Sequence, residues 1–311
     1  MLLRLSAGEI GRLFSEGIEP EPAPAPAARR LRREAAFREN LAIKARRFMR
    51  VLARFARPER VVHLPATFDL LFRERLVKSG HLPDPRGALP AADGFAGLAH
   101  DLTPASMIEA YGKGLSPSAS LGPVAWHCRP TRLVAQPADI AREFDVRIAG
   151  AERGWIVAFD RDVDSVLALS GRPPDRSDIM PARLMSGFAE LFDAGFAHSF
   201  ELRDELGQVI GGGFGVAVGG VFVLEGAFET IAGAAKLGLS HVAGRLRDWN
   251  FSAVECAPGV AWLGEELFHA IPREEFLALI ALHMGEEKVG RWRNEDSVDI
   301  LATPDGRRLA A

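Results

Sequence analysis

Three runs of apolar residues in the middle of the chain predict three successive β-strands. The runs cover residues 197–202, 209–216 and 223–228. Charged residues separate the first two runs, whereas Gly219-Gly220 between the second and the third is typical of a two-residue hairpin turn. We therefore predict three antiparallel strands that pair in the order of the sequence.

Segments with an apolar residue at every third or fourth position flank these strands and predict helices. In chain order, the further expected elements are a strand at 155–159, a helix capped by Asp160, helices at 181–194 and 232–249, a strand at 251–256, and helices at 264–269 and 272–284. This alternation of strands and helices is typical of an α/β (α+β) domain in which helices cover both faces of a mixed sheet.

The first sixty residues follow a different pattern. Alternating prolines at 19–26 favour an extended conformation. A basic helix is predicted from residue 28 to residue 56. Its apolar positions recur on one face, and they are Leu41, Phe48, Leu52 and Phe55. Because arginines fill the other face, we expect the helix to dock through its apolar side and to present its charge outward.

Charge is spread unevenly along the chain. The 311 residues carry a formal net charge of −3. Residues 29–60 hold 12 Lys or Arg against 3 Asp or Glu, residues 1–28 hold 2 against 4, and residues 61–311 hold the remaining 24 against 34. A basic segment on an otherwise acidic protein indicates an anionic partner. The alternative interpretation is a solvated amphipathic helix with no such partner.

Composition excludes several classes of protein. With 48% hydrophobic and 25% charged residues, the chain is typical of soluble globular proteins. Its longest uncharged apolar run, at 209–224, has 16 residues, whereas a membrane-spanning helix needs about 20. Because Cys128 and Cys256 are the only cysteines, we expect a reducing, cytoplasmic location without a disulfide framework. No Cys/His cluster has zinc spacing, so we expect neither a metal nor a cofactor.

Short motifs occur in order between residues 82 and 282. They are Ala110-Tyr111 with Gly114; Gly195-Phe196-Ala197-His198-Ser199 with Glu201; Gly211-Gly212-Gly213-Phe214-Gly215-Val216; Glu225 with Phe228; Lys236; and Glu255-Cys256. In order and spacing they resemble the motifs of the leucyl/phenylalanyl-tRNA–protein transferases, bacterial enzymes with an acetyltransferase-like domain. The resemblance implies a GNAT-like catalytic domain at 144–285 behind a small domain at 61–143. The remaining parts of the expected domain organisation are the N-terminal extension at 1–60 and a tail at 286–311.

Some positions depart from the pattern of that family. Glu255 stands in place of the family's catalytic Asp, Ala257 in place of its Gln, and Phe188 in place of a Tyr. The Trp-Trp-Ser-Pro-x-x-Arg motif of the family is represented here by Trp126-His127-Cys128-Arg129 and by Arg132. The exchange of Asp for Glu lengthens the reach of the carboxylate by one methylene, and a misplacement of about 1 Å can lower a rate about a hundredfold.

The function that the resemblance implies is aminoacyl transfer. Enzymes of this family move a Leu- or Phe-like amino acid from aminoacyl-tRNA to the N-terminal amine of a protein or peptide, which is thereby marked for degradation. The aminoacyl-tRNA is a co-substrate, and the second partner is an acceptor with a free N-terminus. On this basis, we expect the basic segment 29–60 to add affinity for the donor tRNA without reading its sequence.

Transfer of an aminoacyl group to an amine is aminolysis of an ester, which requires a group that accepts the amine proton. Glu225 and Glu255 lie in apolar strands and fall on acidic positions of the family. We predict that both are catalytic and face one cleft, where two neighbouring acids can separate their pKa values. Alternatively, they bind a cationic side chain of the acceptor, or pair with Lys236 or Arg245 as structural ion pairs.

A Leu or Phe side chain needs an apolar pocket. The candidate substrate-binding residues are Trp126, Tyr111, Phe188, Phe214, Phe228 and Lys236. Aromatic residues at such spacings are also common in an ordinary core, and this interpretation stays open. His198 has no evident Ser or Cys partner, so we expect it to be structural. The two cysteines are expected to be buried and inert.

Two other functions stay open at this point. Residues 208–213 fit a loose Gln-x-x-Gly-x-Gly pyrophosphate loop, which would indicate an acyl-CoA-dependent N-acyltransferase on the same fold. Such a loop must open a helix, whereas a strand is expected here. The other alternative is a catalytically inactive relative that binds tRNA or peptide.

Overall fold

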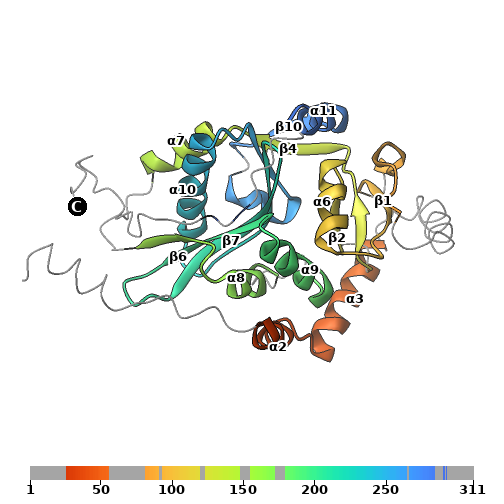
Figure 1. The fold of residues 1–311 in the computed structure, drawn as a ribbon, viewed down its shortest axis with the longest axis horizontal. Coiled ribbons are helices and arrows are strands. Elements are labelled where there is room, and N and C mark those ends of the chain that lie inside the picture. The colour runs from red at the N-terminus through yellow and green to blue at the C-terminus, as the bar shows by residue number, and fades with distance from the viewer. Residues whose placement is uncertain are drawn as a thin grey trace, which may run out of the picture.

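A mixed seven-stranded sheet forms the centre of the protein in the computed structural model (Figure 1). The structure describes residues 26–55, 81–90, 93–119, 123–147, 155–171, 179–264, 266–283, 290 and 292. The strands are β4 (Thr131–Ala135), β5 (Ile156–Phe159), β6 (Ala197–Arg203), β7 (Val209–Val218), β8 (Val221–Glu229), β9 (Ala253–Cys256) and β10 (His269–Pro272). They lie in the order β10-β4-β9-β8-β7-β6-β5, and only β8 and β9 pair in parallel.

The three central strands confirm the prediction made from the apolar runs. β6 pairs antiparallel with β7, and β7 pairs antiparallel with β8. Gly219 turns the chain between β7 and β8 with φ of +56°, a conformation that favours glycine. A Cβ at this position would lie 2.3 Å from the carbonyl oxygen of His283, so the close approach of the C-terminal helix also requires glycine here.

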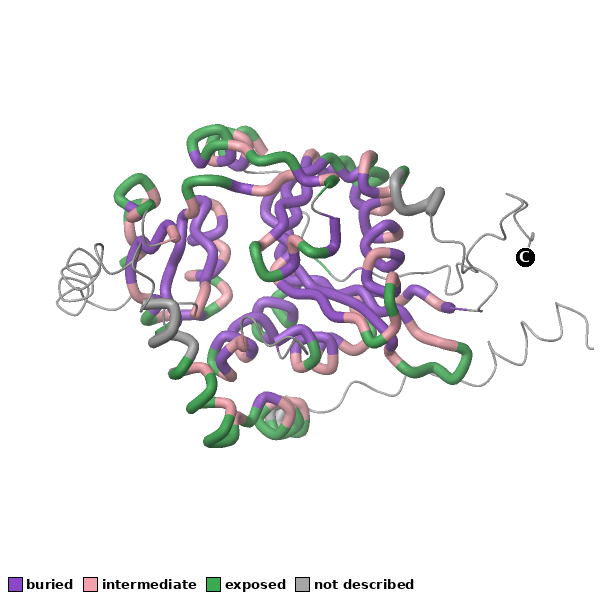
Figure 2. The backbone as a smooth tube through the Cα atoms, turned by 180° about the vertical axis from the view of Figure 1, so that it is seen from behind, coloured by how far each residue is buried: buried purple, intermediate pink, exposed green. Residues whose placement is uncertain are grey.

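Helices cover both faces of the sheet, as predicted. α7 (Pro137–Arg147) and α10 (Ala234–Asp248) pack on one face with Phe222 and Leu224. α8 (Val163–Ser170) and α9 (Ala182–Asp193) pack on the opposite face with Phe214. The two helix layers lie on either side of the sheet in Figure 1, and Figure 2 shows buried residues along its central strands β6, β7 and β8.

A small second sheet lies beside the main one. It contains β1 (Phe95–Leu98), β3 (Ala125–His127) and β2 (Ser116–Ser118), in that order. α6 (Pro104–Gly112) begins after Thr103 with proline at its first position, as its sequence indicates. The expected boundary at residue 143 falls inside α7, and β4 already belongs to the main sheet. α11 (Arg273–His283) follows β10.

Residues 26–55 of the N-terminal extension form two helices rather than the single helix that was predicted over 28–56. α2 (Pro26–Ala36) and α3 (Leu41–Phe55) are separated at Asn40, whose side chain accepts a hydrogen bond from the Ile43 backbone N–H (2.8 Å). Asn is a strong N-cap residue, and this bond starts α3 as a new helix. The prolines at 19–25 and the tail after residue 292 lie outside the described residues.

Two further predictions were wrong. Asp162, rather than Asp160, caps α8 by accepting a hydrogen bond from the Ser165 N–H (3.3 Å). The described residues 264 and 266–269 are not helical: the short helix η4 (Pro258–Leu263) precedes them, and β10 starts at His269. The strand at His269 forms because it pairs with Val134, which lies 135 residues earlier in the chain and outside the reach of a local pattern. No helix in the described part of the chain is long and apolar enough to span a membrane.

Candidate active site

Glu225 is the extra residue of a β-bulge in β8. Leu224 pairs with Gly215 of β7 and Gly226 pairs with Phe214, so Glu225 has no residue opposite it. A bulge redirects side chains and is common beside active sites. Here it leaves Glu225 on the face of the sheet that α6 covers, within reach of Tyr111. Glu225 retains partial exposure to solvent, although its neighbours Leu224 and Gly226 are buried.

Tyr111 holds the carboxylate of Glu225. Its hydroxyl donates a hydrogen bond of 2.7 Å to Glu225 Oε1. Tyr111 lies in the last turn of α6 and is 2% exposed, so its orientation is fixed by packing. Burial, and then the neighbouring Glu225, raise the pKa of Tyr111 well above its ordinary value. The phenol is therefore a neutral donor throughout the physiological pH range.

Glu255 forms a buried ion pair with Arg132. Arg132 Nε lies 2.9 Å from Glu255 Oε1, and the two side chains are only 2% and 4% exposed. Arg132 also donates to the carbonyl of Gly114 (3.0 Å) and stacks its guanidinium on the ring of Phe276, 4.2 Å from the centroid. Glu255 Oε2 accepts no hydrogen bond from any described residue. The partner of Glu255 is thus Arg132, and neither Lys236 nor Arg245 of α10.

Strand pairing brings the two acids to one face of the sheet. β8 and β9 pair in parallel with Val223 beside Glu255, and β4 and β9 pair with Val134 beside Glu255. Because side chains alternate along a strand, Glu255 shares its face with Val223 and with Arg132, two residues before Val134. Glu225 reaches Tyr111 on this same face.

The environment separates the properties of the two acids. Burial raises the pKa of Glu225 to about 7; Glu255 adds to the rise, while the Tyr111 hydrogen bond and the charges of Arg129 and Arg132 oppose it. Burial also raises the pKa of Glu255, against the lowering effects of Arg132 and Arg129. Glu225 is therefore a partly exposed carboxylate that exchanges a proton near neutral pH, whereas Glu255 is sealed against an arginine.

Arg129 acts on both acids through its charge, and Arg273 lies behind it against the carbonyl of Arg129. Arg129 donates to the hydroxyl of Ser116 (3.2 Å), and Arg273 at the start of α11 reaches the backbone carbonyls of Pro85 and Ala88, each at 3.4 Å. Arg129 Nε and Arg273 Nη2 are buried and find no acceptor among the described residues. The two acids are therefore accompanied by two arginines, Arg129 and Arg132.

The predicted acyl-binding aromatics form a closed core next to the acids. The rings of Phe188 and Phe214 meet edge to face, with centroids 5.0 Å apart. Trp126, Phe188, Phe214 and Phe228 all belong to the cluster on this face, and each is at most 4% exposed. They lie near Tyr111 in the fold, but none presents an open surface to a ligand.

Lys236 is not brought to the acids. It lies near the N-terminus of α10, on the opposite face of the sheet. The same helix terminus bears on the acyl-CoA alternative: Glu229 Oε2 accepts hydrogen bonds from the backbone N–H groups of Gly233 (3.1 Å) and Ala235 (3.2 Å). The chain's own carboxylate therefore occupies the position where a pyrophosphate would bind. Gly211, Gly212 and Gly213 lie inside β7 and open no helix.

His198 packs into a structural cluster away from the two acids. Its Nδ1 lies 2.9 Å from Asp160 Oδ2, and the ring of Trp292 stacks on it at 3.9 Å. Asp160 also accepts the backbone N–H groups of Ser199 (2.8 Å) and Trp292 (2.8 Å). The contacts are those of a positioned histidine that anchors residue 292 to the sheet.

The cysteines offer no nucleophile. Cys128 and Cys256 are buried and unpaired, and burial raises the pKa of each thiol. Among the residues that the structure describes, no three His, Cys, Asp or Glu side chains gather as metal ligands would.

Arg132 is the functional residue that the sequence analysis underrated. The signal was present, because an arginine within the strand Thr131–Ala135 must find a buried partner, and because Arg132 matches the Arg of the family's Trp-Trp-Ser-Pro-x-x-Arg motif. What the sequence did not contain was the pairing of β4 with β9, which joins residues 123 positions apart.

Comparison with known proteins agrees with the motifs. A family model described as leucyl/phenylalanyl-tRNA protein transferase matches residues 135–281. A protein named leucyl/phenylalanyl-tRNA–protein transferase from Teredinibacter turnerae is 32% identical over 208 residues, which are 65% of this chain and 79% of that protein. Its namesake from Pseudomonas putida is 30% identical over 229 residues, 73% of this chain and 97% of the relative. The namesake from Syntrophus aciditrophicus is 31% identical over 200 residues, 63% and 83% of the two chains.

Proposed function

The chain belongs to the leucyl/phenylalanyl-tRNA–protein transferase family, and we propose that it transfers an amino acid from aminoacyl-tRNA to the N-terminal amine of a protein or peptide. The transferred amino acid is of the Leu or Phe type, as the resemblance of the motifs implies. The modified acceptor is destined for degradation, and the reaction takes place in the cytoplasm. Neither a metal nor a cofactor enters the scheme.

The proton acceptor in this proposal is Glu225. In aminolysis, the acceptor amine attacks the ester carbonyl, the bond to the ribose oxygen breaks, and one proton must leave the nitrogen. Glu225 Oε2 takes that proton and returns it to the departing ribose oxygen, while Oε1 stays bound to the Tyr111 hydroxyl. A carboxyl group whose pKa is about 7 is suited to both steps, because general acid–base catalysis works best near the operating pH.

Glu255 has a different role in the proposal. Its ion pair with Arg132 favours the ionised form and opposes the rise in pKa that burial causes. A negative charge nearby raises the proton affinity of a carboxylate. The charge of Glu255 raises the pKa of Glu225 in this way. We assign Glu255 as the residue that tunes Glu225, and Arg132 as the residue that positions Glu255. The longer side chain of Glu, compared with the family's Asp, allows this contact with the arginine.

The finer description of the fold also belongs to the proposal. An acetyltransferase-like, GNAT-like architecture is supported by the mixed sheet, by its single parallel pair β8–β9, and by helices on both faces. The bulged strand β8 carries Glu225 at the parallel pair. The small sheet with α6 contributes Tyr111, so the two parts of the chain build the site together.

One observation carries the proposal: Glu225 is the partly exposed acid, with a pKa near 7, in a chain that belongs to this family. The test supplies radiolabelled Leu- or Phe-tRNA, and separately labelled acetyl-CoA, together with a peptide that starts with Arg. We expect label to reach the peptide from aminoacyl-tRNA and not from acetyl-CoA.

Two outcomes would contradict the proposal. Transfer from acetyl-CoA alone would identify an acyl-CoA-dependent enzyme, although Glu229 already fills the helix terminus that a pyrophosphate would need. Transfer from neither donor, with tRNA still bound, would identify an inactive relative that binds tRNA.

A further inference from the structure

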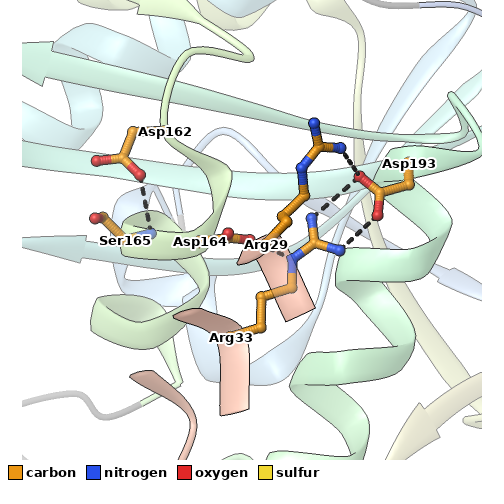
Figure 3. Close-up of polar contacts among 6 residues, drawn as sticks. All are labelled: Arg29, Arg33, Asp162, Asp164, Ser165 and Asp193. Carbon is orange, nitrogen blue, oxygen red and sulfur yellow. Dashed lines mark hydrogen bonds and ion pairs between the residues drawn. The ribbon is translucent and has the colours of Figure 1, made fainter. Parts of the chain in front are cut away.

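The first helix of the N-terminal extension docks through arginines. Arg33 Nε lies 2.7 Å from Asp164 Oδ1 at the start of α8, and Arg33 Nη1 lies 2.5 Å from Asp193 Oδ2 at the end of α9. Arg29 adds a third ion pair to Asp193 at 3.2 Å. Figure 3 shows both guanidinium groups reaching the carboxylate of Asp193. Leu41, one of the four apolar positions that were expected to dock, is 84% exposed, so the expectation is wrong for that residue; the side chains of the other three lie outside the described ones.

The segment between α2 and α3 fastens the extension a second time. Phe37 is buried in the core on the α8–α9 face and is 1% exposed. Glu39 Oε1 accepts the backbone N–H of Ala182, the first residue of α9, at 2.7 Å, and pairs with Arg47 of α3 at 2.8 Å. Pro181 offers no side-chain cap for α9, so Glu39 supplies the missing acceptor. The extension is thus an integral part of the folded protein.

The basic residues of the extension divide into two sets. Arg29, Arg33 and Arg47 face inward and are paired. By contrast, Arg32, Lys44 and Arg46 are exposed, and none of their side chains has an ion pair or hydrogen bond with another described residue, although the charge of Lys44 acts on Glu39. We call these three the outward cations. Two of them, Lys44 and Arg46, lie in the first turns of α3, the end of that helix that Figure 1 shows next to α2.

The charge of the whole chain indicates the partner. Residues 29–60 carry 12 basic and 3 acidic groups, whereas residues 61–311 carry 24 basic and 34 acidic groups. The net negative charge of residues 61–311 repels a polyanion, whereas the net positive charge of residues 29–60 attracts it. The extension therefore adds more affinity for an anionic partner than for a neutral one. We propose that the outward cations bind the phosphate backbone of the donor tRNA. This inference rests on the proposed function, which brings tRNA to the protein, and it assigns the contact to exposed side chains of α2 and α3.

The test measures the salt dependence of tRNA binding by the full chain. The variant Lys44→Gln with Arg46→Gln removes two outward cations and keeps good helix formers. The control, Arg142→Gln with Arg247→Gln, removes the same charge from exposed positions on α7 and α10. Each phosphate contact contributes about 0.7 to 0.9 to the log–log slope, so the wild type should lose about tenfold more affinity than the variant between about 50 and about 200 mM salt. The control should keep the slope of the wild type.

Equal slopes for the variant and the wild type would overturn the inference, and so would an equal reduction in the control, which would show a general charge effect. A parallel assay of transfer to the peptide separates the two proposals. If the wild type transfers the amino acid but the slopes are equal, only this inference fails. If the slope falls in the variant but no transfer occurs, only the proposed function fails.

Flotation with anionic lipid vesicles is a second experiment. If the wild type binds the vesicles, the variant does not, and the two have the same tRNA slope, the outward cations bind a membrane and the inference is overturned.

Discussion

Arginine–carboxylate pairs hold both the active site and the N-terminal extension, but they act in opposite environments. Arg132 and Glu255 are 2% and 4% exposed, whereas Arg33 and Asp193 are 11% and 34% exposed. Water screens the second pair, so it contributes little to stability and much to the position of α2. The first pair is almost without water, so its two charges act on the pKa of Glu225 in opposite directions with little screening, and removal of one partner leaves a charge that nothing compensates. The same kind of pair therefore attaches α2 in the extension, whereas in the candidate site it acts on the proton affinity of Glu225.

The largest effect on stability is expected at the buried pair. Arg132→Gln leaves Glu255 without its counter-charge, and breaking a buried pair in this way lowers the free energy of unfolding by about 3–5 kcal/mol. Denaturant unfolding at neutral pH measures the change. The double variant Arg132→Gln with Glu255→Gln removes both charges and should recover much of the loss. If the double variant is no more stable than the single one, the pair is not the source of the effect.

Next in size is the effect of Glu225 on stability. Because its pKa rises from 4.5 to about 7 on folding, its contribution is fully present below pH 4.5 and is lost as the pH rises through about 7. A shift of this size corresponds to a loss of about 3 kcal/mol at most. Glu225→Gln keeps an acceptor for the Tyr111 hydroxyl and removes this loss. The variant should therefore become progressively more stable than the wild type between pH 4.5 and 8, as followed by denaturant unfolding across that range. A constant difference would contradict a raised pKa.

The smallest effect belongs to the extension. Arg33→Gln removes ion pairs that are partly exposed, and it should lower the free energy of unfolding by about 1 kcal/mol or less. The matched comparison is Phe37→Ala, which empties a buried site of the same extension and should lower it by about 3–5 kcal/mol. High salt should reduce the effect of the first variant and not that of the second. If Arg33→Gln proves as damaging as Phe37→Ala, its ion pairs behave as buried ones.

The fold and the site differ in how far the sequence could predict them. β6, β7 and β8 follow from local apolar runs and from the Gly219-Gly220 turn, and each of these signals is contained within a few residues. The contact between Arg132 and Glu255 depends on the pairing of β4 with β9, and the docking of Arg33 on Asp193 joins residues 160 positions apart. Such pairings are fixed by the assembled protein, because many partners for a buried charge agree equally well with the local pattern.

The bulge shows the same limit within a correctly predicted strand. The apolar run identified β8, and Glu225 within it was identified as an acid that needs a partner. Whether that acid points to α6 or to α10 depends on one unpaired residue in the register with β7. The raised pKa of Glu225 follows from that orientation, so it was beyond the reach of the sequence pattern.

The most direct test of the account is the pH dependence of kcat for the wild type and for Glu225→Gln, with both substrates saturating. Loss of a general base lowers kcat by about 10²- to 10⁴-fold, and Glu190→Gln at an exposed position of α9 is the charge-matched control. The acceptor amine titrates equally in both proteins, so dividing kcat of the wild type by kcat of Glu225→Gln isolates the contribution of Glu225. We expect this wild-type-to-variant ratio to rise with pH and to level off above about 7. A ratio that stays within a few-fold of one, or that is independent of pH, would show that Glu225 does not accept the proton.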